Sequence, residues 1–299
     1  MTVPVADEGP HPAGSEISWV ETTWLEFCDD ASGLAGVVRL DVRPNQGASG
    51  VSLRFFLSDD GFVLADHVTS RVVGESSVVE IEDARLETIQ PLRRWSVKYD
   101  GGSHSLAAAA DVGKREEERK SRLERLIVEL DVVAVQDAVA GSGSFAQPVR
   151  VTGEVWVSGD RYVVDSPGLR GKSWHAGSVA ERATYLSLSF GTERALFARV
   201  ETPAGGAADV VEGWTSIDGT VRPLRALHVE PAADASGAVT ALSVVAHDDG
   251  GEHRIAVELP WIAPFRGRRS GGRPFELRLA VARARWDDHA GYGLVEQLE

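Results

Sequence analysis

The stretch that decides the fold, residues 51–65, reads VSLRFFLSDDGFVLA. Apolar and polar side chains alternate from Val51 to Phe55, which is the two-residue period of a strand with one buried face. The run Asp59-Asp60-Gly61 then supplies residues that tolerate the backbone angles of a tight turn, and apolar residues resume after it. The segment therefore predicts an antiparallel β-hairpin.

Similar stretches occur further along the chain. Trp95, Val97 and Tyr99 share one face of a predicted strand that should stop at Asp100-Gly101-Gly102, and residues 151–157 alternate up to a turn at 158–160. Each segment has the length of a barrel strand. We therefore expect an all-β protein.

One charged stretch departs from this pattern. Residues 114–126 read KREEERKSRLERL, with both signs of charge and with Leu123 and Leu126 three positions apart. A solvated helix or a loop that joins two strands is the expected structure.

The best candidate for a linker is the small, polar run from Gly141 to Pro148. It divides the chain almost in half, and it suggests an N-terminal β domain over residues 1–147 and a C-terminal β domain over residues 148–299.

The two halves resemble a weak internal repeat. Thr23-Trp24-Leu25 and Thr184-Tyr185-Leu186 each open a strand, and each is followed by a turn and by a strand with an arginine, Arg39 or Arg199. An Asp-Gly turn and a His-Val pair come later in both halves. A duplicated β unit explains this order, and chance similarity among strand and turn patterns is the alternative.

Composition excludes several classes of function. A formal net charge of −14 repels phosphate backbones and anionic headgroups, so we expect neither nucleic acid nor membrane partners. Cys28 is the single cysteine, which excludes an intrachain disulfide and fits a reducing compartment. The polar N-terminus lacks a secretory pattern, and no apolar run is long enough to span a bilayer. We expect a soluble cytoplasmic protein, and its residue usage suggests a bacterial source.

Several motifs together resemble the lipocalin-like family that is related to hydroxyneurosporene synthase, a carotenoid hydratase. The most specific is Gly168-Leu169-Arg170-Gly171-Lys172-Ser173-Trp174, which is similar to the family signature Gly-x-Arg-Asp-His-Ser-Trp. The resemblance covers nearly the whole chain, and its other motifs are listed here: Trp24 to Phe27, Gly33 to Arg39, Arg43-Pro44-Asn45, Leu92 to Gly101, Arg285-Trp286-Asp287 and Gly291-Tyr292-Gly293.

The resemblance implies two tandem lipocalin-like antiparallel β-barrel or sandwich halves packed together. It also implies a hydrophobic small-molecule substrate. Gly171 and Lys172 stand where the family has Asp and His, and glycine cannot protonate an alkene. This departure argues against carotenoid-type hydration.

Related proteins of this fold close rings by Diels–Alder-type reactions, which need a shaped pocket and no cofactor. A hydrogen-bond donor beside a substrate carbonyl would add electrostatic help, and Lys172 and His175 are the candidates. Standard nucleotide, phosphate, zinc and serine-hydrolase motifs are absent from the sequence, so we expect no cofactor and no metal.

Eight tryptophans suggest an aromatic cavity lining, although filling the core is the alternative for each ring. The candidate substrate-binding residues share a place on or beside a predicted strand: Trp24, Trp156, Trp174, Tyr185 and Trp214. Glu154 shares a strand face with Trp156. If that face is buried, its pKa should be raised and it could act as an acid or base; exposure to water is the alternative.

Three functions remain open at this point. The first is a cofactor-independent cyclase, pericyclic or isomerising, that acts on a hydrophobic polyene, polyketide or terpenoid of natural-product biosynthesis. The second is an alkene hydratase with Glu154 as its acid. The third is a non-catalytic carrier of a hydrophobic compound. A purely structural β protein without a cavity is the alternative to all three.

Overall fold

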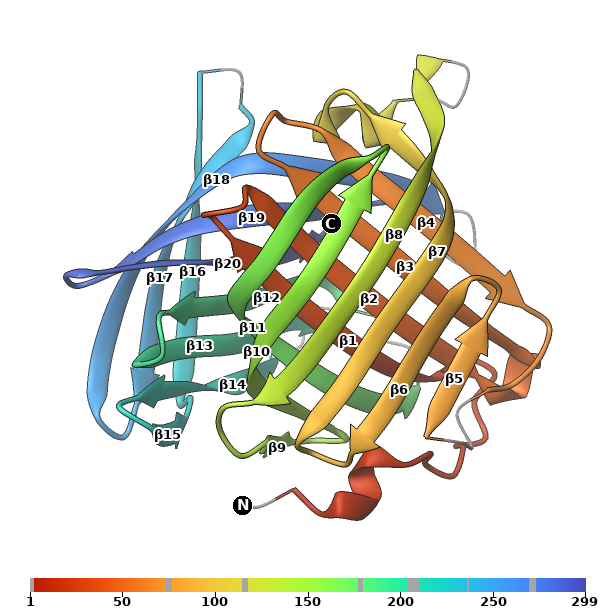
Figure 1. Cartoon of the computed structure of the whole chain (residues 1–299). Helices are drawn as coiled ribbons and strands as arrows, with labels where there is room; N and C mark the ends of the chain where they lie inside the picture. Colours follow the sequence, from red (N-terminus) through yellow and green to blue (C-terminus); the bar gives the residue numbers. More distant parts are fainter. Residues whose placement is uncertain are drawn as a thin grey trace. The chain divides into compact units, whose positions relative to one another are not determined.

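Antiparallel strands make up almost all of the computed structural model (Figure 1), which describes residues 3–73, 77–114, 118–176, 180–203, 210–235, 237–268 and 273–299. The all-β prediction is confirmed. The chain forms two compact units, the first of Met1–Leu106 with Ser121–Ser178 and the second of Ala107–Lys120 with Val179–Glu299.

The first unit contains one antiparallel sheet, preceded by the short 3-10 helix η1 (Val5–Glu8). Its strands are β1 (Trp19–Asp29), β2 (Leu34–Arg43), β3 (Ala48–Leu57), β4 (Phe62–Thr69), β5 (Val78–Ile81), β6 (Ala84–Gln90), β7 (Arg94–Leu106), β8 (Ser121–Ala134), β9 (Val139–Gly141), β10 (Ser144–Val157) and β11 (Asp160–Ala176). The predicted hairpin is β3 and β4, with Phe56 opposite Phe62.

This sheet closes on itself. The strand order runs β4-β3-β2-β1-β11-β10-β8-β7, and β4 pairs again with β7 through Phe62 opposite Leu106. The closing contact joins residues 62–64 of β4 to residues 104–106 of β7, and the other part of β7 pairs with β6. Strand β7 can do this because it is longer than the sequence predicted: it continues through Gly101 and Gly102 instead of stopping there, and its two ends pair with β6 and β4.

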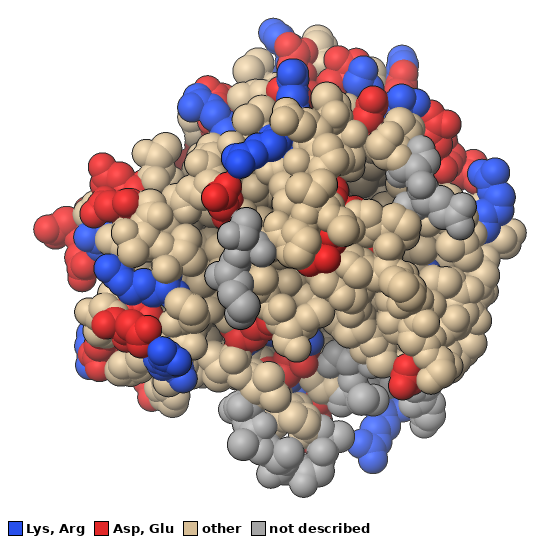
Figure 2. Space-filling view, turned by 90° about the horizontal axis from the view of Figure 1, so that it is seen from below, with Lys and Arg blue, Asp and Glu red and all other residues tan. Residues whose placement is uncertain are grey.

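Charged side chains cover the outward face of the sheet in the first unit. Bidentate pairs such as Arg125 with Asp100 and Arg150 with Asp165 link neighbouring strands across exposed positions. Basic and acidic side chains lie next to one another on the face that Figure 2 shows, so the two signs are mixed. Exposed pairs of this kind contribute at most about 1 kcal/mol each.

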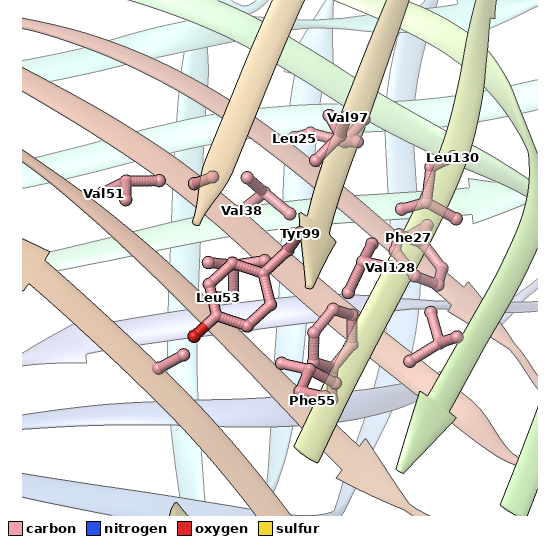
Figure 3. Packing of buried hydrophobic residues seen from close by; sticks show 14 of the residues in the cluster. Leu25, Phe27, Val38, Val51, Leu53, Phe55, Val97, Tyr99, Val128 and Leu130 are labelled. Atoms are coloured by element: carbon pink, nitrogen blue, oxygen red, sulfur yellow. The ribbon is translucent and has the colours of Figure 1, made fainter. Parts of the chain in front are cut away.

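Apolar side chains fill the inside of the closed sheet. Phe27, Leu53, Phe55, Tyr99 and Val128 come from four different strands and are all buried (Figure 3). The predicted face of Trp95, Val97 and Tyr99 is buried here as well. Strand alternation places every second residue of these strands in this core.

The second unit contains a sheet of nine strands in the order β15-β14-β13-β12-β20-β19-β18-β17-β16, and the short helix η3 (Ala109–Gly113). The strands are β12 (Ala180–Phe190), β13 (Arg194–Pro203), β14 (Val210–Ile217), β15 (Thr220–Pro223), β16 (Ala226–Ala233), β17 (Val239–Asp248), β18 (Gly251–Arg268), β19 (Pro274–Trp286) and β20 (His289–Leu298). Its core centres on Leu186, Leu188, Val244 and Trp286.

The strand orders of the two units correspond, as the repeat in the sequence suggested. Trp24 pairs with Arg39 between β1 and β2, and Tyr185 pairs with Arg199 between β12 and β13. The later part of the expected repeat does not correspond, because His67 lies on β4 whereas His228 lies on β16.

The expected linker is a turn within the first sheet. Ser142 and Gly143 connect β9 to β10, and the buried Pro148 lies inside β10. A boundary after Gln147 would therefore cut β10, and the first unit instead keeps both β10 and β11. The pairing of β11 with β1 explains this, because the sheet cannot close without it.

The charged stretch 114–126 is not a helix at its C-terminal end. Ser121 begins strand β8, in which Leu123 is exposed and Leu126 is buried. Cross-strand pairing with β7 overrides the local charge pattern there. Residues 115–117 of this stretch lie outside the described residues.

Candidate functional site

The first unit contains a cavity of about 270 Å³. Its walls are inward-facing aliphatic side chains of six strands: Leu25, Val38, Leu40, Val42, Val79, Leu86, Val97 and Val132. Residues of the N-terminal segment, including Glu8 and His11, also line it, together with Glu21, Arg170 and Lys172. Glu87 and four hydroxyl side chains line it as well: Thr23, Ser77, Thr88 and Ser96. The cavity thus combines a mostly apolar wall with polar side chains and a cluster of buried ionisable groups, a combination typical of small-molecule sites.

Arg170 and Glu8 form a buried bidentate ion pair in this cluster. The two terminal guanidinium nitrogens of Arg170 lie 3.0 and 2.8 Å from the Glu8 carboxylate oxygens, and both side chains are less than 10% exposed. Glu8 also accepts hydrogen bonds from the Trp95 indole and the Leu92 amide. Burial lowers the pKa of Arg170, and the Glu8 carboxylate opposes that shift.

The same guanidinium stacks on an aromatic ring. Its central carbon lies 3.7 Å from the centroid of Trp95, a cation–π arrangement that suits the flat guanidinium. Arg170 therefore fixes Glu8 on one side and Trp95 on the other.

Lys172 continues the cluster two residues along β11, on the same face as Arg170. Its ammonium forms an ion pair with Glu21 and donates to the carbonyl oxygens of Glu8, at 2.9 Å, and Gly9, at 2.5 Å. An ammonium has three protons, and these are three acceptors. Lys172 lies at the cavity as the sequence placed it, but its protons are engaged by the protein.

His11 completes the cluster. Its ring stacks on Trp174 with the centroids 3.7 Å apart and the planes 7° from parallel. Its Nδ1 lies 3.4 Å from a Glu21 carboxylate oxygen, and its backbone amide donates to the other oxygen at 3.0 Å. Its Nε2 is buried and has no hydrogen-bond partner among the described residues; Asp7 lies 3.7 Å away.

Sequence reasoning missed Glu8, His11, Glu21 and Arg170 as site residues. Arg170 and Lys172 are two positions apart, so they share a strand face. If that face is buried, the two cations need two carboxylates as partners, so the signature motif could have predicted a buried ionic cluster. The identity of those carboxylates had no local signal, because Glu8 lies 162 positions from Arg170.

Trp24 lines the cavity, as the sequence suggested, and Gly171 makes room for it. The two residues are opposite each other in the pairing of β1 with β11, and a Cβ at position 171 would lie 2.3 Å from Cζ2 of the indole. The indole thus occupies the space that the aspartate of the family signature would need.

Glu154 and Trp156 lie on a different face. Arg161 forms an ion pair with Glu154, and the Trp156 indole donates to the same carboxylate. These contacts, the Arg161 hydrogen bond first, hold the pKa of Glu154 below its ordinary value. The condition for a raised pKa at Glu154 is therefore not met, because the carboxylate is partly exposed and paired, as the alternative had it.

The remaining predicted residues are not brought to this cavity. His175 faces away from Lys172 on β11, and its Nδ1 lies 2.7 Å from the Ala176 carbonyl oxygen. Trp174 reaches the cluster through its stack on His11. Tyr185 and Trp214 belong to the second unit, where the Tyr185 hydroxyl donates to Glu201 and Trp214 is buried.

The described residues contain no group of three His, Cys, Asp or Glu side chains arranged to hold a metal ion. None of the helices in the described part of the chain is both long and apolar enough to cross a membrane.

Solved structures share this fold. A protein assigned as AttH from Nitrosomonas europaea superposes with a TM-score of 0.68 at 12% identity, over 95% of this chain and 94% of that one. Kievitone hydratase from Nectria haematococca superposes with a TM-score of 0.60 at 11% identity, over 99% of this chain and 92% of that one. CghA with Sch210972 superposes with a TM-score of 0.63 at 12% identity, over 94% of this chain and 88% of that one. The expected lipocalin-like fold is therefore confirmed.

Comparison by sequence identifies the family. No curated protein matches the chain. The family model described as a domain of unknown function, DUF7064, matches residues 4–299. Because this match covers nearly every residue, the chain belongs to the DUF7064 family.

Proposed function

We propose that this protein encloses a hydrophobic small molecule in the cavity of the first unit and promotes its ring closure without a cofactor. The substrate would be a polyene, polyketide or terpenoid intermediate of a natural-product pathway, and the reaction would take place in the cytoplasm. The shared fold with kievitone hydratase and CghA supports an enzymatic role.

One observation carries this proposal: most of the cavity wall is apolar, and each of the two buried cations that line it is paired with a carboxylate. Arg170 is paired with Glu8, and Lys172 with Glu21. A pericyclic ring closure needs a pocket that holds a flexible chain in one reactive conformation, and it needs no free ionised acid. Hydration needs a proton donor to carbon, and Glu154, the earlier candidate, is an ionised and partly exposed carboxylate elsewhere on the sheet.

The test is to incubate the purified protein with a panel of hydrophobic polyene, polyketide and terpenoid intermediates and to follow binding and product mass. A product of unchanged mass, formed above the background rate and with fixed stereochemistry, supports ring closure. A product heavier by one water supports a hydratase instead, and binding without conversion supports a carrier. Absence of binding by the whole panel would overturn the proposal.

A cavity-filling variant locates the reaction. Val97 lines the cavity, so Val97→Phe should reduce binding and turnover at least tenfold by occupying substrate volume. Val163→Phe is the matched control, because Val163 is exposed on β11 of the same unit. Equal turnover in V97F and wild type would exclude this cavity as the reaction site.

A further inference from the structure

The exposed residues that line the cavity come from two parts of the chain. Pro10 and Ala13 belong to the segment before β1, and Val72 and Ser77 belong to the connection between β4 and β5. The other residues that line the cavity are buried or half-buried. Because exposed lining residues mark where a cavity meets the solvent, the mouth lies between this segment and the β4–β5 connection.

We call residues 4–18, the segment before β1, the strap. Both of its ends are fixed, because Val3 is buried in a small apolar cluster with Ala138 and Phe145, and Trp19 begins β1. Between these ends the strap passes the turn that joins β6 to β7, where Glu8 accepts from the Leu92 amide (Figure 1). The strap therefore forms one side of the mouth.

The strap is not part of the sheet. Pro4, Pro10 and Pro12 have no backbone N–H, so this stretch cannot pair as an ordinary strand. Among the described residues, the backbone-to-backbone hydrogen bonds of the strap run within it or to Trp19, and none reaches another strand. By contrast, β1 pairs with β2 and β11, and β7 pairs with β6 and β8. The strap can thus lift without breaking the sheet.

Charged contacts hold the strap down at the cavity. Arg170 binds the Glu8 carboxylate, and Lys172 donates to two carbonyl oxygens of the strap. Lifting the strap admits water to both cations, so the separation of Glu8 from Arg170 leaves no unpaired charge in a dry interior. Lys172 keeps its ion pair with Glu21, which belongs to β1. This contact is therefore firm when the strap is down and separable when it lifts.

A second set of contacts lies outside the cavity, in the short 3-10 helix η2 (Pro44–Gln46). The exposed side-chain amide of Asn45 donates to two strap carbonyl oxygens, at 2.7 and 2.8 Å, and that of Gln46 donates to a third, at 3.0 Å. These carbonyl groups belong to residues 14–17, directly after Ala13 at the mouth. Asn45 and Gln46 do not line the cavity, so they can be changed without altering its walls.

We propose that the strap is the gate of the cavity: the ligand enters and leaves through this mouth, and the strap lifts off the barrel to let it pass. Such a gate sets the rate of ligand exchange and leaves unchanged the walls that select the ligand. This inference rests on the proposed function, since it concerns access to the same site.

The test loosens the strap outside the cavity and measures ligand exchange on the full chain by stopped flow. The probe is decanol with a terminal bromine atom, which quenches the fluorescence of Trp24 and Trp95 in the cavity. In the double variant Asn45→Ala, Gln46→Ala, the association and dissociation rate constants should both rise roughly 3- to 10-fold, as expected for lost exposed hydrogen bonds. The dissociation constant should change less than about twofold, because the walls are intact.

Gln90→Ala is the matched control. Gln90 is an exposed amide side chain at the end of β6 in the same unit, and it does not line the cavity. Both rate constants should stay at their wild-type values in this variant.

The backbone amide of His11 reports the motion of the strap without any ligand. It donates to the Glu21 carboxylate at 3.0 Å, so it exchanges with solvent when the strap lifts. In N45A/Q46A its hydrogen-exchange rate, followed by NMR, should rise by about the same factor as the ligand rate constants, and in Q90A it should not change.

Faster exchange of this amide with unchanged ligand rates would overturn the gate, because the strap would then move without controlling entry. Unchanged exchange and unchanged ligand rates would overturn it too, because the strap would then not be held at the mouth by these contacts. In both cases, quenching that V97F prevents would still support the cavity as the binding site. Lack of quenching in wild type would count against both proposals.

Discussion

A single carbon atom is decisive at position 171. Trp24 and Gly171 face each other across β1 and β11, and the indole lies where a larger side chain would project. The carbonyl oxygen of Phe145, 2.6 Å from the same Cβ position, closes the other side. This chain therefore has glycine where the family has aspartate, and the Trp24 indole fills the space of that side chain.

Gly171→Ala should destabilise the protein by about 2 kcal/mol or more, because the added methyl overlaps the indole and a backbone carbonyl. Denaturant unfolding followed by circular dichroism measures the effect. Gly102→Ala is the matched control: its Cβ would meet only the Leu123 side chain, at 3.7 Å, so its unfolding free energy should stay within about 0.5 kcal/mol of wild type. An equal effect of both changes would refute the close-packing argument.

Arg170→Lys should also be disruptive although it keeps the charge. Lysine cannot form the bidentate contact with Glu8 or stack flat on Trp95, so we expect a loss of about 2 kcal/mol in the same unfolding assay. Arg150→Lys removes a bidentate contact with Asp165 at exposed positions, where the loss should be below about 0.5 kcal/mol. If R170K and R150K behave alike, burial is not what makes the Arg170 pair important.

At the level of the elements, the two sheets differ in how distant strands are linked, by backbone pairing in the first unit and by a side-chain hydrogen bond in the second. Backbone pairing links β4 with β7 in the first unit. In the second unit, no backbone pairing among the described residues joins the two ends of the sheet. A side chain links them instead: Asp248, at the end of β17, accepts a hydrogen bond from Thr215 of β14. The same carboxylate accepts from the Gly250 amide and lies 3.0 Å from His253 Nε2 of β18. The Asp248 side chain is fully buried.

Asp248→Ala should lower the unfolding free energy by about 3 kcal/mol near pH 7, because it leaves buried donors without an acceptor. Asp249→Ala is the control, because Asp249 is next in sequence but is exposed and paired with Arg225. Its unfolding free energy should stay close to that of wild type.

The effect of Asp248 depends on pH. Burial tends to raise its pKa, but hydrogen bonds from Thr215, Gly250 and His253 outweigh burial and lower it. A lowered native pKa means that the stabilisation is present above the unfolded value of about 3.9 and is lost as the pH falls through the native pKa. The difference between wild type and D248A should therefore shrink below about pH 4; a constant difference down to pH 2 would contradict this.

At the scale of the whole molecule, charge governs the choice of partners. The formal net charge is −14, and on the face that Figure 2 shows basic and acidic side chains lie near one another. We expect no measurable binding to duplex DNA or to anionic vesicles at neutral pH and low salt, in gel-shift and co-sedimentation assays. Below the isoelectric point near pH 5.1 the net charge reverses, and vesicle binding should appear. Binding at neutral pH would reveal a local basic surface.

The sequence by itself determined the strands and their faces. The alternation in residues 51–55, 95–99 and 151–157 was enough to predict which side chains share a strand face, because the strand period is a local property, but the sequence left open which face of residues 151–157 is buried. The signature at 168–174 likewise pointed to the strand that carries Arg170 and Lys172. Strand ends were less predictable, as β7 and β8 show, since pairing with neighbours decided where they begin and end.

Only the tertiary structure decided what those residues contact. Glu21 reaches Lys172 because β1 pairs with β11, across about half of the chain. The segment before β1 brings Glu8 to Arg170 and His11 to Trp174. The division into units after Ser178 depends on the same long-range pairing, because β11 closes the first sheet against β1. A local pattern specifies a face of a strand, whereas the partner of that face is set by sheet closure, which no short stretch of sequence encodes.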